Sequence, residues 1–373
     1  MANMKNEYEL DAAVFSSEDM ADFSEFLDER EANASWDEIR VCEVTVIPHT
    51  RDVCGISEDS RREATYSVET PVGTLALRDI AEPSLLERAK ISGYALGELT
   101  SEDFSDIVTR CLKTSSDTTN IRRQDGKLSA FMANSYKKLP QPDVYETAMT
   151  VIDREFAGEF ITASWSHRMT MAKYRCSILS SDFQKIFSGK GLNISELEMG
   201  ILVATSDNGY SGLNIFPELT GIMTTGRRLS LPILGEIAMP HKGNNVSLEK
   251  FAENLTLVFA KAEESKERLK EMDQIILDYP FNAFCNALKK SGIGKKAAKQ
   301  AIDTVAVLYG NGGTATAADL YFRAAEVAYS AEDQMQEMAI MESVSKFLKF
   351  SNSLWEKEFD RPVNCWSFSV GPM

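Results

Sequence analysis

Residues 159–178 read EFITASWSHRMTMAKYRCSI and contain two runs typical of β-strands, Glu159–His167 and Met169–Ile178. Downstream, Leu197–Ser206 and Ser211–Phe216 surround the turn Asp207-Asn208-Gly209-Tyr210, and two further strands follow, broken at Gly226. Upstream, two strand-like runs flank Gln124-Asp125-Gly126, where Asp-Gly is a strong hairpin signal. Strands and turns at this spacing predict one antiparallel sheet. The two upstream strands are predicted at Thr119–Arg123 and Lys127–Asn134. The two strands broken at Gly226 are predicted at Leu219–Thr225 and Arg227–Leu231.

Further strands and helices are expected on both sides of this region. Ile39–Ile47 (IRVCEVTVI) alternates and is rich in β-branched residues, so it predicts a strand. A hairpin is expected over 64–77, with helices over 83–99, 101–113 and 143–156. From Ser247 the pattern becomes helical, over 247–277, 281–290, 294–309, 316–331 and 332–359, with Ser247 and Thr316 as N-caps.

These elements predict an α+β fold: an antiparallel sheet with flanking helices, followed by an all-α C-terminal helical region. We expect an acidic N-terminal arm at 1–40, an α+β sheet domain at 41–245 and a helical region at 246–373.

The charge of the chain is uneven. Over 373 residues the net charge is −16, which argues against a protein whose whole surface is basic and binds DNA. Residues 1–40 contribute −9, whereas residues 120–190 carry +4. The acidic segment 1–36 is interpreted either as a solvated leader, or as an arm that competes with nucleic acid for a basic surface or docks on a protein partner.

Targeting signals are not apparent. No apolar run approaches the length of a membrane helix, and the acidic N-terminus does not resemble a secretory signal. The six cysteines are widely and irregularly spaced, without a CxxC pair. We therefore expect a cytoplasmic protein with reduced thiols and no membrane contact.

A basic and aromatic segment is the first candidate nucleic-acid site. Basic residues interleaved with aromatics on a sheet can follow a phosphate backbone and stack bases. If the neighbouring hairpin shares the sheet, its residues would extend the same surface. The alternative is a solvated face with the aromatics in the core. The candidate residues are Arg122, Arg123, Lys127, Phe131, Tyr136, Lys137 and Lys138, extended by His167, Arg168, Lys173, Tyr174 and Arg175.

The second candidate patch lies in Leu288–Ile302, which reads LKKSGIGKKAAKQAI. Gly-Ile-Gly between two helical segments resembles the hairpin of helix-hairpin-helix DNA binders, in which backbone N–H groups face a phosphate. The alternative is an ordinary helix corner with Gly292 as C-cap and lysines facing water. The residues of this patch are Lys289, Lys290, Gly292, Gly294, Lys295 and Lys296, with Lys299 nearby.

Catalytic and metal-binding motifs are sparse. The three histidines, His49, His167 and His241, are isolated, and no nucleophile-elbow motif is present. Asp207-Asn208-Gly209 has one carboxylate, too few for an all-protein calcium site, and is interpreted as a tight turn. Gly310–Gly313 lacks the lysine of a phosphate loop and is interpreted as a connector. We expect no enzyme, cofactor or metal.

Four stretches, taken in order, carry a resemblance to a known family. They are Leu128–Leu139 (LSAFMANSYKKL) followed by Asp143, Ser206–Ile215 (SDNGYSGLNI), Thr224-Thr225-Gly226, and Thr316–Leu320 (TAADL) followed by Ala324, Ala325, Ala328 and Leu348. Over about residues 118–350 this order is similar to the uncharacterised phage/plasmid-like protein family, which is encoded by phages, plasmids and integrated elements. That family tends to carry Cys-x-Asn-Gly where this chain has Thr224–Gly226. The resemblance implies an origin in a mobile element.

The expected function is non-catalytic binding of nucleic acid, most specifically single-stranded DNA in replication or recombination. A sheet with a basic hairpin is similar, in fold only, to the strand-annealing proteins of phage recombination. The alternative is a homo-oligomeric structural or interaction protein, for assembly or counter-defence, without a nucleic-acid role. A homo-oligomer is expected under either hypothesis.

Overall fold

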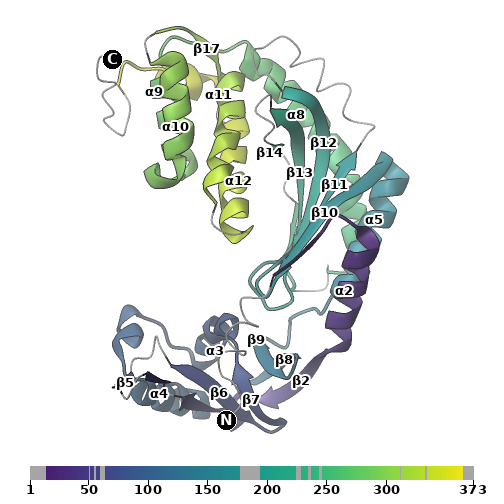
Figure 1. Ribbon diagram of the computed structural model, residues 1–373, viewed down its shortest axis with the longest axis vertical. Helices are drawn as coiled ribbons and strands as arrows, with labels where there is room; N and C mark the ends of the chain where they lie inside the picture. Colours follow the sequence, from purple (N-terminus) through teal and green to yellow (C-terminus); the bar gives the residue numbers. More distant parts are fainter. Residues whose placement is uncertain are drawn as a thin grey trace.

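The computed structural model describes residues 14–49, 51–53, 56–58, 64–176, 194–223, 228–233, 237–242, 246–310, 312–331 and 334–363. The fold is α+β, as predicted, and the chain forms a C-shaped body (Figure 1). A six-stranded sheet lies at one end, a curled seven-stranded sheet forms the middle, and the C-terminal helices lie at the other end. The expected motif Thr224–Gly226 and the ends of the strands predicted at 169–178 and 219–225 lie outside the described residues.

The larger sheet is antiparallel throughout, in the order β1-β10-β11-β12-β13-β14, with β15 also pairing with β13. Helix α5 (Gln141–Phe156) packs against this sheet, and buried residues of the helix and of the sheet belong to the same large apolar cluster. Its strands are β1 (Val14–Ser17), β10 (Gly158–Ser166), β11 (Thr170–Cys176), β12 (Ile194–Thr205), β13 (Leu213–Met223), β14 (Arg228–Pro232) and β15 (Ile237–Met239).

The expectation of a single sheet was wrong, because the hairpin around Asp125-Gly126 pairs elsewhere. Its strands join a second sheet, in the order β2-β8-β9-β7-β6-β3, in which only β7 and β9 run parallel among the described strands. A separate apolar cluster fills the space under helices α3 (Glu82–Ala89) and α4 (Ser101–Lys113). The strands are β2 (Ala34–Arg40), β3 (Thr45–His49), β6 (Thr65–Thr70), β7 (Gly73–Leu77), β8 (Thr118–Gln124) and β9 (Lys127–Met132); β4 (Arg51–Val53) and β5 (Ile56–Glu58) pair separately.

The strand predicted at Ile39–Ile47 is two strands. A 3-10 turn at Val41–Glu43 separates β2 from β3, and these strands lie at opposite edges of the six-stranded sheet. Val41 and Val44 are buried, so the crossing segment packs under the sheet. Alternation correctly identified extended chain, but it cannot show that the chain changes its pairing partner.

The segment predicted as an acidic arm is part of the fold from residue 14 onward. β1 pairs with β10, helix α2 (Met20–Ala32) packs on α5, and β2 pairs with β8. Phe23 and Leu27 on α2 are buried in the main core, and Asp19 caps the helix. Most of the acidic residues of α2 lie on its solvent-exposed face, and for this reason the sequence resembles that of a solvated arm. Helix α2 thus links the two sheets (Figure 1).

The helical region shares the core of the larger sheet. Ser247 caps α7 as predicted, and Thr316 forms a capping box with Asp319 at α11. The helix predicted over 247–277 is divided at Leu257. The elements are α7 (Leu248–Thr256), α8 (Val258–Asp273), α9 (Pro280–Ser291), α10 (Lys295–Tyr309), α11 (Ala317–Ala324), α12 (Gln334–Lys349) and α13 (Asn352–Leu354), with β16 (Ile276–Leu277) pairing with β17 (Ala315–Thr316).

Replacing Phe23 tests whether the N-terminal segment is structural. We expect Phe23→Ala to lower the free energy of unfolding by about 3–5 kcal/mol, because a buried aromatic ring leaves a cavity in the core. Chemical denaturation measures this, with Tyr94→Ala as the control because Tyr94 is 83% exposed. Equal stabilities for the two variants would contradict the packing of α2.

Candidate functional site

The hairpin turns of the larger sheet meet β8 and β9 of the smaller sheet through buried charges. Arg122 on β8 is 3% exposed, and its Nη2 lies 2.5 Å from Oδ2 of Asp207 in the turn after β12. Its Nη1 donates to Oε1 of Gln124 at 2.6 Å, and Glu31 lies 3.9 Å away. Burial raises the pKa of the Glu31 carboxyl, against the opposing effect of Arg122. A buried guanidinium is strongly unfavourable unless paired, so Arg122 holds the Asp207 turn on β8.

A second set of charges joins the same two sheets. Arg78 is almost fully buried, with Nη2 3.5 Å from Oδ2 of Asp125 and Nη1 3.0 Å from Nε2 of His167. Because arginine only donates, His167 accepts through Nε2. Arg30 at the end of α2 also pairs with Asp125 at 3.1 Å and lies 4.1 Å from the Trp165 ring centroid. Burial lowers the pKa of Arg30. Three arginines and three carboxylates therefore balance at the junction.

An aromatic column continues this junction. The ring of Tyr136 stacks on Trp36, with centroids 5.6 Å apart, and on His241, with centroids 5.1 Å apart. Lys138 lies over Trp36 at 4.9 Å, and His241 Nδ1 lies 3.2 Å from the carbonyl oxygen of Lys137. Burial raises the pKa of the Tyr136 phenol, so this ring stays neutral. The column places the segment after β9 against residues 240–242.

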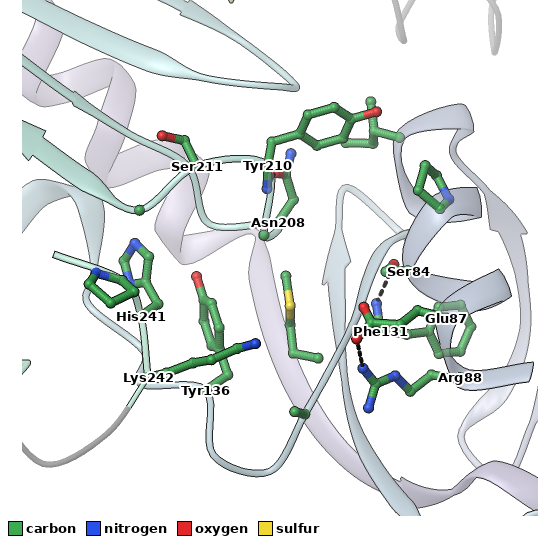
Figure 2. A pocket seen from close by; sticks show the side chains of 17 residues that line it. Ser84, Glu87, Arg88, Phe131, Tyr136, Asn208, Tyr210, Ser211, His241 and Lys242 are labelled. Carbon is green, nitrogen blue, oxygen red and sulfur yellow. Dashed lines mark hydrogen bonds and ion pairs between the residues drawn. The ribbon is translucent and has the colours of Figure 1, made fainter. Parts of the chain in front are cut away.

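A cleft of about 510 Å³ opens beside this column (Figure 2). Its walls come from α3, the end of β9, the turn 208–212 and the segment 240–242. This volume is in the range of small-ligand sites. The lining residues are Ile80, Pro83, Ser84, Glu87, Arg88, Phe131, Met132, Ala133, Tyr136, Asn208, Gly209, Tyr210, Ser211, Gly212, Pro240, His241 and Lys242.

Both cations and aromatic rings line the cleft, and a further cation lies at its rim. Figure 2 shows Lys242 extending into it from the side of His241, with Glu87 and Arg88 on the opposite wall. Arg88 pairs with Glu87 at 2.8 Å, while its buried Nε lacks a hydrogen-bond partner. At the rim, the exposed Arg168 lies 5.9 Å from the Tyr210 ring centroid. This arrangement suits a ligand with a flat ring and negative charge.

Two glycines shape the wall that carries Tyr210. Gly209 has φ +84°, a conformation that other residues rarely adopt, as expected for the predicted turn. A Cβ on Gly212 would lie 2.6 Å from the Met239 carbonyl oxygen, so the backbones of 212 and 239 are in contact. Asn208 accepts from the Tyr210 amide through Oδ1 at 3.2 Å, and its Nδ2 donates to the His167 carbonyl. The Tyr210 ring is consequently presented at the cleft.

The structure separates most of the residues predicted for the first patch. Arg122, Lys127 and Tyr174 are buried and do not line the cleft, so they cannot lie along a strand of nucleic acid in this conformation, whereas the buried Phe131 forms part of the cleft wall. The two hairpins also belong to different sheets. Tyr136, Lys137 and Lys138 stay together beside the cleft, and both lysines are exposed. Among the rest, Arg123 pairs with Asp37, Arg175 with Glu159 and Glu198, and Lys173 with Glu337.

The second patch forms the corner between α9 and α10. Gly292 is the left-handed C-cap of α9, as in the helix-corner interpretation, and Gly294 is the N-cap of α10. Lys289, Lys290, Lys295 and Lys296 are exposed. The corner is therefore compatible with both interpretations made from the sequence.

Sequence reasoning missed Arg88, Tyr210 and Lys242 as cleft residues. Arg88 and Lys242 belong to the separate lining segments 80–88 and 240–242, which lie far in the sequence from 131–136 and 208–212, so no local pattern could have brought them together. Tyr210 had one local signal, an aromatic ring directly after the Gly209 turn. That signal indicates a presented side chain but gives no partner for it.

Removing Asp207 tests the junction. We expect Asp207→Ala to lower the free energy of unfolding by about 3 kcal/mol, at the low end for a broken buried ion pair because Glu31 and Gln124 remain near Arg122. Urea denaturation measures the loss. Arg110→Ala, which breaks an exposed pair with Asp106, is the control and should change stability little. A similar small change for both would show that Arg122 does not need Asp207.

The pH dependence of stability tests the environment of His241. Burial lowers its pKa below the ordinary 6.5, so the unfolded chain takes up the proton first as the pH falls. Stability contributed by neutral His241 is therefore complete above about pH 6.5 and is lost below it. We expect the stability difference between wild type and His241→Gln to shrink with acidification. Glu31 affects both proteins equally, so a difference that is constant with pH would contradict this environment.

Comparison with known proteins adds no relative. No protein-family model, curated protein or solved structure matches the chain. In the part of the chain that the structure describes, no helix has the length and apolar character needed to cross a membrane. Within that same part, no group of three or more His, Cys, Asp or Glu side chains is placed to hold a metal ion. The functional argument therefore rests on the geometry of the cleft.

Proposed function

We propose that this protein binds single-stranded nucleic acid without catalysis, with bases at the junction cleft and phosphates on its cationic rim. The observation that carries the proposal is an exposed aromatic ring beside exposed cations at one cleft, which lies between the lobe of the six-stranded sheet and the lobe of the seven-stranded sheet. Tyr210 offers a ring at the mouth, and Arg168 and Lys242 offer charge beside it. Aromatic platforms and basic grooves are the features by which proteins hold single strands.

The size and position of the cleft favour a single strand over a duplex. A base that is paired and stacked in a duplex must be extruded before it can enter a protein pocket, whereas an unpaired base avoids most of that cost. Lys137 and Lys138 continue the positive charge beyond the cleft on the exposed segment after β9. Together with Arg168 at the rim, these residues are the part of the sequence-based prediction that the proposal retains.

The biological setting is also a proposal. The resemblance of residues 118–350 to phage/plasmid-like proteins supports a role in replication or recombination of a mobile element, in a host cytoplasm. The alternative remains a homo-oligomer for assembly or counter-defence. A large, salt-insensitive oligomer purified free of nucleic acid would favour that alternative.

Substituting the exposed ring tests the proposed function. We expect Tyr210→Ala to weaken binding of a fluorescent single-stranded oligonucleotide by about 1–3 kcal/mol, roughly 5- to 150-fold, through loss of base stacking. Lys242→Gln should instead lower the dependence of log affinity on log salt by about 0.7, for one lost phosphate contact. Fluorescence anisotropy over a salt series measures both.

Matched controls separate these effects from general changes. Tyr279→Ala removes another partly exposed tyrosine outside the cleft, and Lys261→Gln removes a lysine that is already paired with Glu264. Both should bind as wild type does. If wild type fails to bind at tens of micromolar in low salt, or if Tyr210→Ala binds as tightly as Tyr279→Ala, the proposal is wrong.

A further inference from the structure

One face of helix α10 is open to solvent. The exposed residues that form this α10 stripe are Lys296, Gln300, Asp303 and Val307. They follow one another at intervals of four, three and four residues, which places them on one side of the helix at the spacing by which helices pair. Val307 at the end of the stripe is 73% exposed. Covering this aliphatic side chain with a partner would be favourable, because it removes apolar surface from water.

A hollow of about 500 Å³ lies along the α10 stripe. Residues of α10 from Lys296 to Val307 line it, together with Ser330 at the end of the 3-10 helix η4 (Ala325–Ser330). The stripe is therefore one wall of a concave surface. Such a surface can receive the ridge of side chains of a second helix.

The charged residues of the hollow are available to a partner. In the described part of the chain, no ion pair involves Lys296, Lys299 or Asp303. Lys299 and Asp303 remain unpaired although they lie four residues apart on one helix. On α8, by contrast, each of Lys261, Lys266 and Lys270 pairs with a glutamate three residues away.

The order of residues along the stripe determines which partner fits. The lysines lie near the start of α10, whereas Asp303 and Val307 lie toward its end. An antiparallel second copy, with a two-fold axis between the levels of Gln300 and Asp303, brings Lys299 of each copy beside Asp303 of the other. The same register places the aliphatic stem of Lys296 over Val307. A parallel copy would instead oppose like charges, which is repulsive.

We propose that two copies of this chain form a dimer by antiparallel pairing of their α10 stripes. A second copy is favoured over an unrelated protein because the α10 face supplies both members of each contact, the lysine–aspartate pair and the lysine stem over valine. The stripe lies in the helical region, away from the junction cleft (Figure 1), so the dimer does not depend on the proposed binding of nucleic acid. A single, mostly polar helix pair buries little area, and the dimer is consequently weak.

Charge reversal tests the register in full-length protein freed of nucleic acid. Analytical ultracentrifugation, from low micromolar to several hundred micromolar protein, measures the dimer dissociation constant. We expect Lys299→Asp and Asp303→Lys each to raise this constant about tenfold or more, because each variant places two like-charge contacts in the dimer. The double variant, Lys299→Asp with Asp303→Lys, should return it to within a few-fold of wild type, because both contacts re-form with exchanged charges.

A matched control uses the exposed pair Asp106 and Arg110 on α4, which also lie four residues apart. Asp106→Lys and Arg110→Asp change the net charge and the repulsion within a helix as the test variants do. Both should dimerise as wild type does. Melting temperatures near that of wild type verify folding of every variant.

Replacing Val307 tests the apolar part of the contact. We expect Val307→Ser to raise the dimer dissociation constant about tenfold, because two aliphatic side chains per dimer lose their cover. Ile276→Ser is the control, since Ile276 is 67% exposed and lies outside the α10 stripe. It should leave the constant unchanged.

The proposal is overturned if wild type remains a monomer at several hundred micromolar. It is equally overturned if the charge reversals on α10 dimerise as the α4 controls do, because the dimer would then use another surface. A double variant that dimerises as weakly as the single variants would contradict the antiparallel register. Binding of oligonucleotides is measured separately, so failure of the dimer leaves the proposed function standing, and the reverse also holds.

Discussion

The pairing of Arg122 with Asp207 is the constraint on which the junction depends. Arg122 is buried in β8, and a buried guanidinium without a carboxylate is too costly to persist. The turn after β12 must therefore lie on the smaller sheet. Its position in turn fixes Asn208, which holds the backbone of Tyr210, and so creates one wall of the cleft. Geometry at one ion pair thus determines where an exposed aromatic ring is presented.

Polar contacts, rather than apolar ones, define how the two lobes meet. Each sheet has its own apolar cluster, and the residues between them are chiefly the balanced arginines and carboxylates with the Trp36–Tyr136–His241 column. Buried ion pairs add little net stability compared with apolar packing, but they are directional. Such a junction accepts one relative orientation of the lobes. The cleft between them is consequently formed before any ligand arrives.

Local signals predicted much of the fold. Asp125-Gly126 marked a hairpin, Ser247 and Thr316 marked helix starts, and the α+β class followed from the order of elements. What failed depended on pairing across long sequence distances. The alternation at Ile39–Ile47 could not reveal two strands at opposite sheet edges. The many acidic residues of α2 favoured a solvated segment, although Phe23 on the same helix is buried. Arg122 resembled a surface cation because its carboxylate lies far along the chain, in a different sheet.

The distribution of charge determines how an acidic protein would hold a polyanion in the proposed mode. Salt at physiological strength screens exposed charges beyond about 8 Å, so a strand responds to nearby side chains rather than to the net charge of −16. The exposed lysines Lys137, Lys138 and Lys242 beside the cleft attract phosphates locally in this mode. An overall negative charge therefore does not by itself prevent such binding.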